Sequence, residues 1–249
     1  MKYAEALEDM GSGTFRRKDV LNVVMKRYPD YNTGSFNRHF SRFISNGLIE
    51  NVGRGLYVTV SDRTAKETYS YRSPSERFSE ISSFLESEFP LADSIVCETV
   101  QLNEFFEHQT AENVIVVAVE KMLTEAVFER MKTKFGSVML SPGPEELRRY
   151  AEDGSVIIVK LTSRYPRNRT DRRAYSIEKL TVDIFAEKTI RSFFSAGDYP
   201  SALENIFGKY RINETALFNY ARMRRIDAKI REMIERDTGV KLHTDGGTC

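Results

Sequence analysis

Residues 35–58 read SFNRHFSRFISNGLIENVGRGLYV. In the first half of this segment, apolar residues recur at the spacing of one helix face; they are Phe36, Phe40, Phe43 and Ile44. This spacing predicts a helix over residues 35–46, with Gly47 as its C-cap. Two short apolar runs follow at residues 48–52 and 56–60, and the glycines between them permit the positive φ angles of a tight turn. The segment therefore predicts a helix followed by a β-hairpin.

Two further helices are expected upstream of this segment. The apolar residues between Tyr3 and Leu7 suit a short first helix. A second helix is predicted over residues 17–28, where valine side chains form one stripe and Pro29 ends the helix. Helix, helix, turn, helix and hairpin is the element order of a winged helix-turn-helix. We therefore predict a winged helix-turn-helix DNA-binding domain at residues 1–60.

The rest of the chain divides into a linker, a larger domain and a tail. Residues 61–73 are mostly polar, which is typical of a linker. Over residues 74–238, predicted helices, one of them at residues 102–107, alternate with strands, which suits a regulatory domain. From residue 177 helices follow one another; the first is predicted over residues 177–194 and the last over residues 214–236, with a break near Arg224. Residues 239–249 are rich in Gly and Thr and predict a frayed tail. The predicted fold class is α/β: a winged helix-turn-helix, then a larger α/β domain with a central mixed or parallel sheet of about four strands and a helical C-terminal part.

Positive charge is concentrated in the small domain. The net charge of the chain is only +1, but residues 11–60 hold eight Lys or Arg against three acids, a net charge of +5. This balance indicates a polyanionic partner, which we expect to be double-stranded DNA. Burying the phenylalanines turns the polar face of the helix toward the major groove and leaves the hairpin tip for a minor groove or a phosphate. The candidate DNA-binding residues are Arg16, Arg17, Lys18, Ser35, Asn37, Arg38, Ser41, Arg42 and Arg54.

Alternatives to DNA binding remain open for parts of this surface. The small domain could serve as a protein-docking adaptor, although its charge favours DNA. His39 flanks the apolar stripe and is expected to pack rather than to read bases. The loop over residues 163–175 combines arginines with tyrosines and is either a second basic surface or a solvated loop. The arginines of this candidate second surface are Arg164, Arg167, Arg169, Arg172 and Arg173.

Motifs for the common enzyme and cofactor classes are missing. The three histidines and two cysteines are scattered, so no metal site and no cofactor are expected, and the phosphate-loop and nucleophile-elbow motifs do not occur. We therefore predict that the protein is not an enzyme. The alternative is a magnesium-dependent DNA nuclease guided by the winged helix, with acids and lysines at strand ends. Its candidate residues are Asp93, Glu98, Glu120, Lys121 and Lys160.

The apolar runs are too short to cross a bilayer, and no signal sequence opens the chain. We therefore expect a cytoplasmic protein without a membrane partner, in which Cys97 and Cys249 stay reduced.

Two stretches carry a family resemblance. The first is FSRFISNGLIENVGRGLYV at residues 40–58, and the second is SIEKLTVDIF at residues 176–185. Both resemble AbiEi-type antitoxins of bacterial abortive-infection (type IV toxin/antitoxin) systems, which act in phage defence. The resemblance covers the hairpin region well and the rest loosely. It implies a repressor, monomeric or weakly dimeric, that binds inverted repeats in its own promoter. It also implies that the protein counters a nucleotidyltransferase-like toxin through a functional rather than a stable contact. The domain at residues 74–238 would then be antitoxin-like, because it would carry this activity and also add a basic surface.

Overall fold

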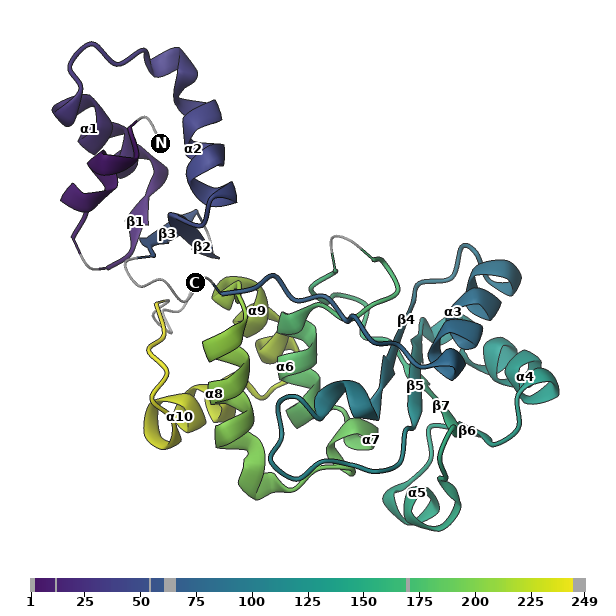
Figure 1. The fold of residues 1–249 in the computed structure, drawn as a ribbon. Helices are drawn as coiled ribbons and strands as arrows, with labels where there is room; N and C mark the ends of the chain where they lie inside the picture. The colour runs from purple at the N-terminus through teal and green to yellow at the C-terminus, as the bar shows by residue number, and fades with distance from the viewer. Residues whose placement is uncertain (1–2, 12, 54, 61–65, 169–170, 244–249) are drawn as a thin grey trace.

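Figure 1 shows the protein as a computed structural model, which describes residues 3–11, 13–53, 55–60, 66–168 and 171–243. The structure is mixed α/β with two separate sheets, one of three strands and one of four. The three-stranded sheet belongs to residues 3–60, which we call the N-terminal unit. The four-stranded sheet lies in the remainder of the chain, which we call the C-terminal body.

The N-terminal unit has the element order that the sequence predicts. It consists of the 3-10 helix η1 (Ala4–Asp9), β1 (Phe15–Arg16), α1 (Arg17–Arg27), the 3-10 turn η2 (Thr33–Ser35), α2 (Phe36–Ser45), β2 (Ile49–Gly53) and β3 (Leu56–Thr59). The strands are antiparallel in the order β1-β3-β2. The first helix is 3-10 rather than α, and β1 was not predicted because two residues carry no periodic signal.

Helix α2 is fixed by its apolar face and by defined signals at both ends. Phe36, Phe40 and Phe43 are buried in one cluster with residues of η1, α1 and β2. The Asn32 side chain accepts a hydrogen bond from the Gly34 backbone N–H at 2.9 Å, which starts the helical turn. At the other end Gly47 has φ +67°, a left-handed conformation that glycine adopts without cost. The helix predicted over residues 35–46, with Gly47 as its cap, is confirmed.

The four-stranded sheet lies at the centre of the C-terminal body. Its order is β4-β5-β7-β6, formed by β4 (Ser94–Glu98), β5 (Ile115–Val119), β7 (Val156–Lys160) and β6 (Val138–Leu140). Strand β4 is antiparallel to β5 and the other pairs are parallel, so the sheet is mixed. All five residues of β5 are buried, as expected for a strand covered on both faces.

Helices cover both faces of this sheet (Figure 1). One face packs against α3 (Glu76–Glu88) and α4 (Thr124–Lys134). The other face packs against α5 (Pro144–Tyr150) and the C-terminal helices. Alternate residues of one strand serve the two cores, since Val117 contacts the first cluster and Val116 the second. The C-terminal helices are α6 (Ile177–Ala186), α7 (Lys188–Arg191), α8 (Tyr199–Lys209), α9 (Glu214–Met223) and α10 (Asp227–Asp237).

Two predicted helices differ from the structure for local reasons. The helix expected over residues 102–107 is replaced by the 3-10 turn η3 (Thr99–Leu102). There the Asn103 side chain exchanges two hydrogen bonds with the Thr110 backbone, at 2.9 and 3.0 Å, which holds a loop. The helix expected over residues 177–194 is divided at Glu187, which is extended and accepts from the Thr189 N–H to cap α7.

The predicted linker and tail are more ordered than expected where the structure describes them. Glu67 forms backbone hydrogen bonds with Lys209 and Arg211 at 2.8 and 2.9 Å, so it lies against the end of α8, and Tyr71 further along donates to Glu98 at the end of β4. In the tail, the Gly239 and His243 amides donate to the carboxylates of Glu204 and Glu214, at 2.7 and 3.0 Å. The frayed tail expected at residues 239–249 is therefore wrong for residues 239–243; residues 61–65 and 244–249 lie outside the described part.

The N-terminal unit meets the C-terminal body through its hairpin. Gly53 has φ +127°, and a Cβ there would lie 2.9 Å from the backbone nitrogen of Thr215 in α9. Glycine is therefore required for both the turn and the close approach of β2 to α9. Figure 1 shows α1 and α2 on the side of the unit away from this contact.

Candidate nucleic-acid interface

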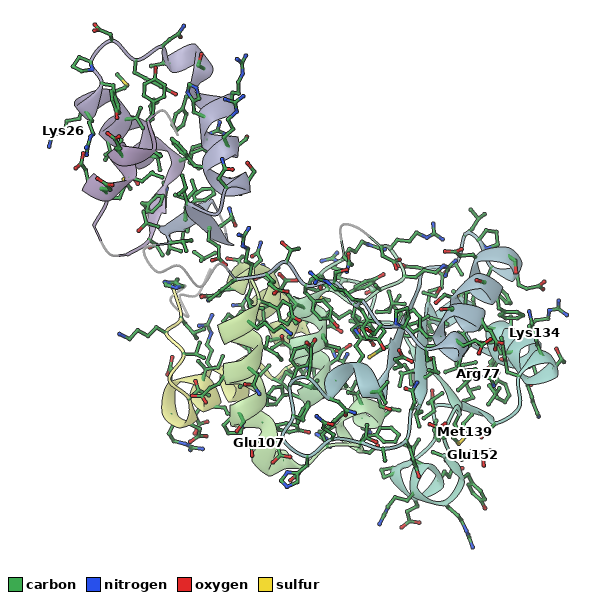
Figure 2. All side chains as sticks on the ribbon, viewed as in Figure 1. Lys26, Arg77, Glu107, Lys134, Met139 and Glu152 are labelled. Carbon is green, nitrogen blue, oxygen red and sulfur yellow. The ribbon has the colours of Figure 1, made fainter. Side chains whose placement is uncertain are left out.

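The outer face of α2 is polar and open to solvent. Asn37, Arg38, Ser41 and Arg42 are exposed, and Ser35 is partly exposed at the start of the helix. These residues point outward because the phenylalanines at the intervening positions are buried, as the 3.6-residue period requires. Figure 2 shows polar side chains along α2 on the side away from α1. Among the residues that the structure describes, none buries these four exposed side chains.

Arg38 and Arg42 are the cations of this face that are free of acidic partners. They are four residues apart, which places them side by side on the helix surface. Within the described part of the chain, no carboxylate comes within 4 Å of either guanidinium. A guanidinium presents five N–H donors in a planar fork, which matches phosphate oxygens or the O6 and N7 atoms of guanine. The pair is therefore available to an anionic partner.

Arg17 joins the start of α1 to the start of α2. Its guanidinium donates to Oδ1 of Asn37 and lies 5.0 Å from the centroid of the Phe40 ring. The basic residues Arg16 and Lys18, both exposed, are its neighbours at the start of α1. The Arg17 contact occupies the Asn37 oxygen that would accept from adenine, so Arg17 must release Asn37 before that residue can pair with a base. Arg54 at the hairpin tip lies outside the described residues.

His39 packs within the N-terminal unit. Its Nδ1 atom is 2.9 Å from the hydroxyl of Tyr31, and its ring centroid lies 5.0 Å from that of Tyr3. Burial raises the pKa of Tyr31 above its usual value, with a smaller contribution from Tyr3. The structure therefore supports the packed role that the sequence favours for His39.

The basic loop over residues 163–175 does not form the surface that its composition predicts. Arg173 is only 3% exposed and donates to Ser94 Oγ and to the carbonyls of Leu85 and Phe89, the latter two at 3.1 and 3.3 Å. Its assignment to a second basic surface is wrong, because the side chain links the loop to β4 and the end of α3. Burial lowers its pKa.

The other described arginines of this loop are exposed, and Arg167 and Arg172 also hold contacts within the C-terminal body. Arg167 donates to both carboxylate oxygens of Asp93 at 3.0 and 2.6 Å. Burial opposes ionisation of Asp93, but hydrogen bonds from Arg167 and Tyr165 outweigh it and lower the pKa of that carboxyl. Arg164 and Arg172 are exposed, and Arg172 also donates to the Pro90 carbonyl at 2.6 Å. Arg169 lies outside the described residues.

The acids considered for a nuclease are divided between opposite ends of the sheet. Asp93 and Glu120 meet at one end, where the Asp93 amide donates to Glu120 Oε1 at 3.2 Å. Glu98 ends β4 at the other end, fully buried, and accepts from Tyr71, from the Ser75 amide and from Asn113. Among the described residues, no three His, Cys, Asp or Glu side chains are grouped as metal ligands. Glu98 is thus separated from Asp93 and Glu120, whereas Lys160, paired with Val119, lies at their end of the sheet.

A buried ionic cluster joins α6 to α9, and sequence reasoning did not find it. Asp183 accepts hydrogen bonds from Lys179, Tyr220 and Arg224, the last two at 2.9 Å. The side chains of Lys179 and Asp183 are each only 2% exposed. Burial disfavours the charged amine, but Asp183 and Tyr220 outweigh it and raise the pKa of Lys179. Every oxygen of Asp183 has a donor, so the cluster holds the fold together rather than facing a ligand.

Comparison with known proteins places the chain in a family. The family model described as "Family of unknown function (DUF6577)" matches residues 35–239, which include α2, the hairpin and nearly all of the C-terminal body. The chain belongs to the DUF6577 family. Among curated proteins, none matches this sequence.

The chain also has a weak similarity to a solved structure. The crystal structure of RV2827C protein from Mycobacterium tuberculosis is 13% identical, with 93% of this chain and 74% of that chain covered and a TM-score of 0.35. At that score the similarity assigns neither fold nor function. In the part of this chain that the structure describes, no helix has both the length and the apolar character needed to cross a bilayer.

Proposed function

We propose that the N-terminal unit is a winged helix-turn-helix and that the protein is a sequence-specific regulator that binds double-stranded DNA through α2. The observation that carries this proposal is the pairing of two faces on one helix. Phe36, Phe40 and Phe43 are buried, while Arg38 and Arg42 are exposed and lack acidic partners. A helix with these two faces, followed by a β-hairpin, suits insertion into a major groove.

The dimensions and charges of the N-terminal unit fit this role. The ten residues of α2 span about 15 Å, enough to present two turns to a major groove about 12 Å wide. Arg16 and Lys18 lie at the start of α1, where they can bind backbone phosphates beside the groove. Arg17 can do the same once it releases Asn37. In this arrangement α2 reads bases and the start of α1 fixes the register on the duplex.

We further propose that the protein acts as an AbiEi-type antitoxin in the bacterial cytoplasm, as a repressor rather than an enzyme. The support for this is the sequence of residues 40–58 and 176–185. On this proposal the protein binds inverted repeats in its own promoter as a monomer or weak dimer. It counters a nucleotidyltransferase-like toxin without a stable complex.

A mobility-shift titration tests the DNA-binding proposal. The full chain is mixed with a duplex taken from upstream of its own reading frame and, separately, with a shuffled duplex of equal length. We expect tighter binding to the native duplex and a logarithmic salt slope of about −0.9 for each phosphate neutralised. Equal affinity for the two duplexes would contradict sequence-specific recognition. No shift of either duplex at low salt would contradict DNA binding altogether.

A further inference from the structure

A cavity of about 410 Å³ lies where the hairpin of the N-terminal unit meets α8 and the C-terminal segment. Its apolar walls come from β2 and β3 on one side and from α8 and the residues after it on the other. Val52, Phe207 and Ile212 in these walls are buried. A volume of this size with apolar walls falls within the range of small-molecule sites.

The charged groups that line the cavity differ in whether they have partners. Glu204 and Glu214 accept hydrogen bonds from the amides of Gly239 and His243, which fixes residues 239–243 as one wall. Glu50, Lys66 and Lys241 also line the cavity. Over the described ranges, these three side chains form neither a hydrogen bond nor an ion pair within 4 Å. One carboxylate and two ammonium groups are therefore available to a ligand.

Glu50 is the group whose charge is least well compensated. Burial raises the pKa of its carboxyl, and the charges of Lys66, Arg211 and His243 only partly offset this effect. A carboxylate removed from water gains most from a cationic group that donates hydrogen bonds to it. Lys66 is half-buried and Lys241 is exposed, and both attract the opposite charge. A ligand that carries both charges beside an apolar group would satisfy all three side chains at once.

We propose that this cavity binds a free α-amino acid with an apolar side chain. The ammonium group pairs with Glu50, the carboxylate lies between Lys66 and Lys241, and the side chain packs on the buried apolar wall. A simple amine would leave the lysines without an anion. A fatty acid would place its carboxylate near the lysines but leave Glu50 unpaired. The two-sided charge of the cavity thus selects a zwitterion.

The place of the cavity suggests what binding would do. Its walls belong to both the N-terminal unit and the C-terminal body, so a bound amino acid would contact both and fix the hairpin against α8. This would tighten DNA binding by preorganising the unit that carries α2. The regulatory consequence rests on the proposed DNA-binding function, whereas amino-acid binding does not.

Calorimetric titration of the full chain in the absence of DNA tests the site. L-leucine is compared with 4-methylpentanoate, which lacks the ammonium group, and with 3-methylbutylamine, which lacks the carboxylate. We expect saturable binding of leucine and affinities lower by about tenfold or more for both analogues. If leucine, isoleucine, valine, methionine and phenylalanine all fail to bind at millimolar concentration, the proposal is overturned.

Substitutions in the cavity give a second arm. Glu50→Gln keeps the shape and removes the charge, and it should weaken leucine binding by about tenfold or more. Glu107→Gln is the control. Glu107 lies in the segment before β5 and is exposed near the start of α8, whereas the cavity lies at the end of that helix (Figure 2). Circular dichroism checks folding, and Lys241→Met replaces Glu50→Gln if the latter is unfolded. Wild-type affinity in the folded variants would overturn the assignment, and it would do so whether or not the protein binds DNA.

Discussion

Substituting Asp183 with alanine is expected to lower the free energy of unfolding by about 3–5 kcal/mol at neutral pH. Asp183 is 1% exposed and accepts hydrogen bonds from Lys179, Tyr220 and Arg224. Its removal leaves an ammonium group buried in the core and reduces the acidic partners of the partly buried Arg224 guanidinium to Glu187. Because α6 and α9 meet at this cluster, the loss should affect the C-terminal body as a whole. Urea denaturation followed by circular dichroism measures the change.

The chain offers a matched control for this substitution. Glu232 and Arg236 are also four residues apart on one helix and are 3.1 Å from each other, but their side chains are 68% and 67% exposed. Glu232→Ala should therefore leave stability unchanged within error, because solvent screens an exposed pair. Equal effects of the two substitutions would mean that the buried ionic cluster does not stabilise the fold.

The pH dependence of the cluster follows from the direction of the lysine shift. The pKa of Lys179 is raised in the folded protein, since Asp183 and Tyr220 outweigh the burial that disfavours the charge. A raised amine pKa contributes stability that is fully present below the unfolded value and is lost as the pH rises through the folded value. The contribution is thus complete at neutral pH and disappears only in alkaline solution above the usual pKa range of lysine.

The combined substitution Arg38→Ala and Arg42→Ala is expected to weaken binding to the native duplex by about a hundredfold or more at physiological salt. Each arginine that binds a guanine contributes about 1–3 kcal/mol of discrimination, and neither side chain has an acidic partner to lose. The fold should be unaffected, because both side chains are exposed. The mobility-shift titration measures the affinity, and thermal unfolding checks the fold.

Removing two arginines also removes two charges, so the control must do the same elsewhere. Arg148 and Arg149 are exposed on α5, which lies in the C-terminal body far from the N-terminal unit (Figure 1). Arg148→Ala with Arg149→Ala should change the affinity by less than about threefold, an effect of overall charge alone. If both double variants lose affinity equally, the loss reports net charge, and α2 is not the reading helix.

Apolar periodicity predicted most of the elements correctly. The stripe of phenylalanines in α2 is a strong signal because it agrees with the helical period. The valine run of β5 is a different signal: a short, continuous, β-branched run, as expected for a strand covered on both faces. The break between α9 and α10 near Arg224 was also predicted and is confirmed. For the N-terminal unit, the outward residues of α2 follow from the same stripe. This is why Arg38 and Arg42 could be predicted as exposed without any coordinates.

The features that escaped prediction depend on contacts between distant residues. Arg173 belongs to a loop whose composition is rich in arginine, but its partners Leu85 and Phe89 are more than eighty residues away in the sequence. The break of α6 at Glu187 depends on local capping and on an ion pair with Arg224 at 3.5 Å. The cavity beside Glu50 exists only because the hairpin and the C-terminal segment meet there. Periodicity reports which face of an element is buried, but not which distant group covers it.

Site-specific photocrosslinking tests the central claim most directly. A photoreactive amino acid is placed at Ser41 on the exposed face of α2 or, as the control, at Lys26, whose side chain points away from α2 in the same unit (Figure 2). Each variant is irradiated with the native duplex. We predict DNA crosslinks from position 41 and none from position 26. Crosslinks from position 26 but not from position 41, or from neither position while the duplex is bound, would contradict the claim that α2 contacts DNA.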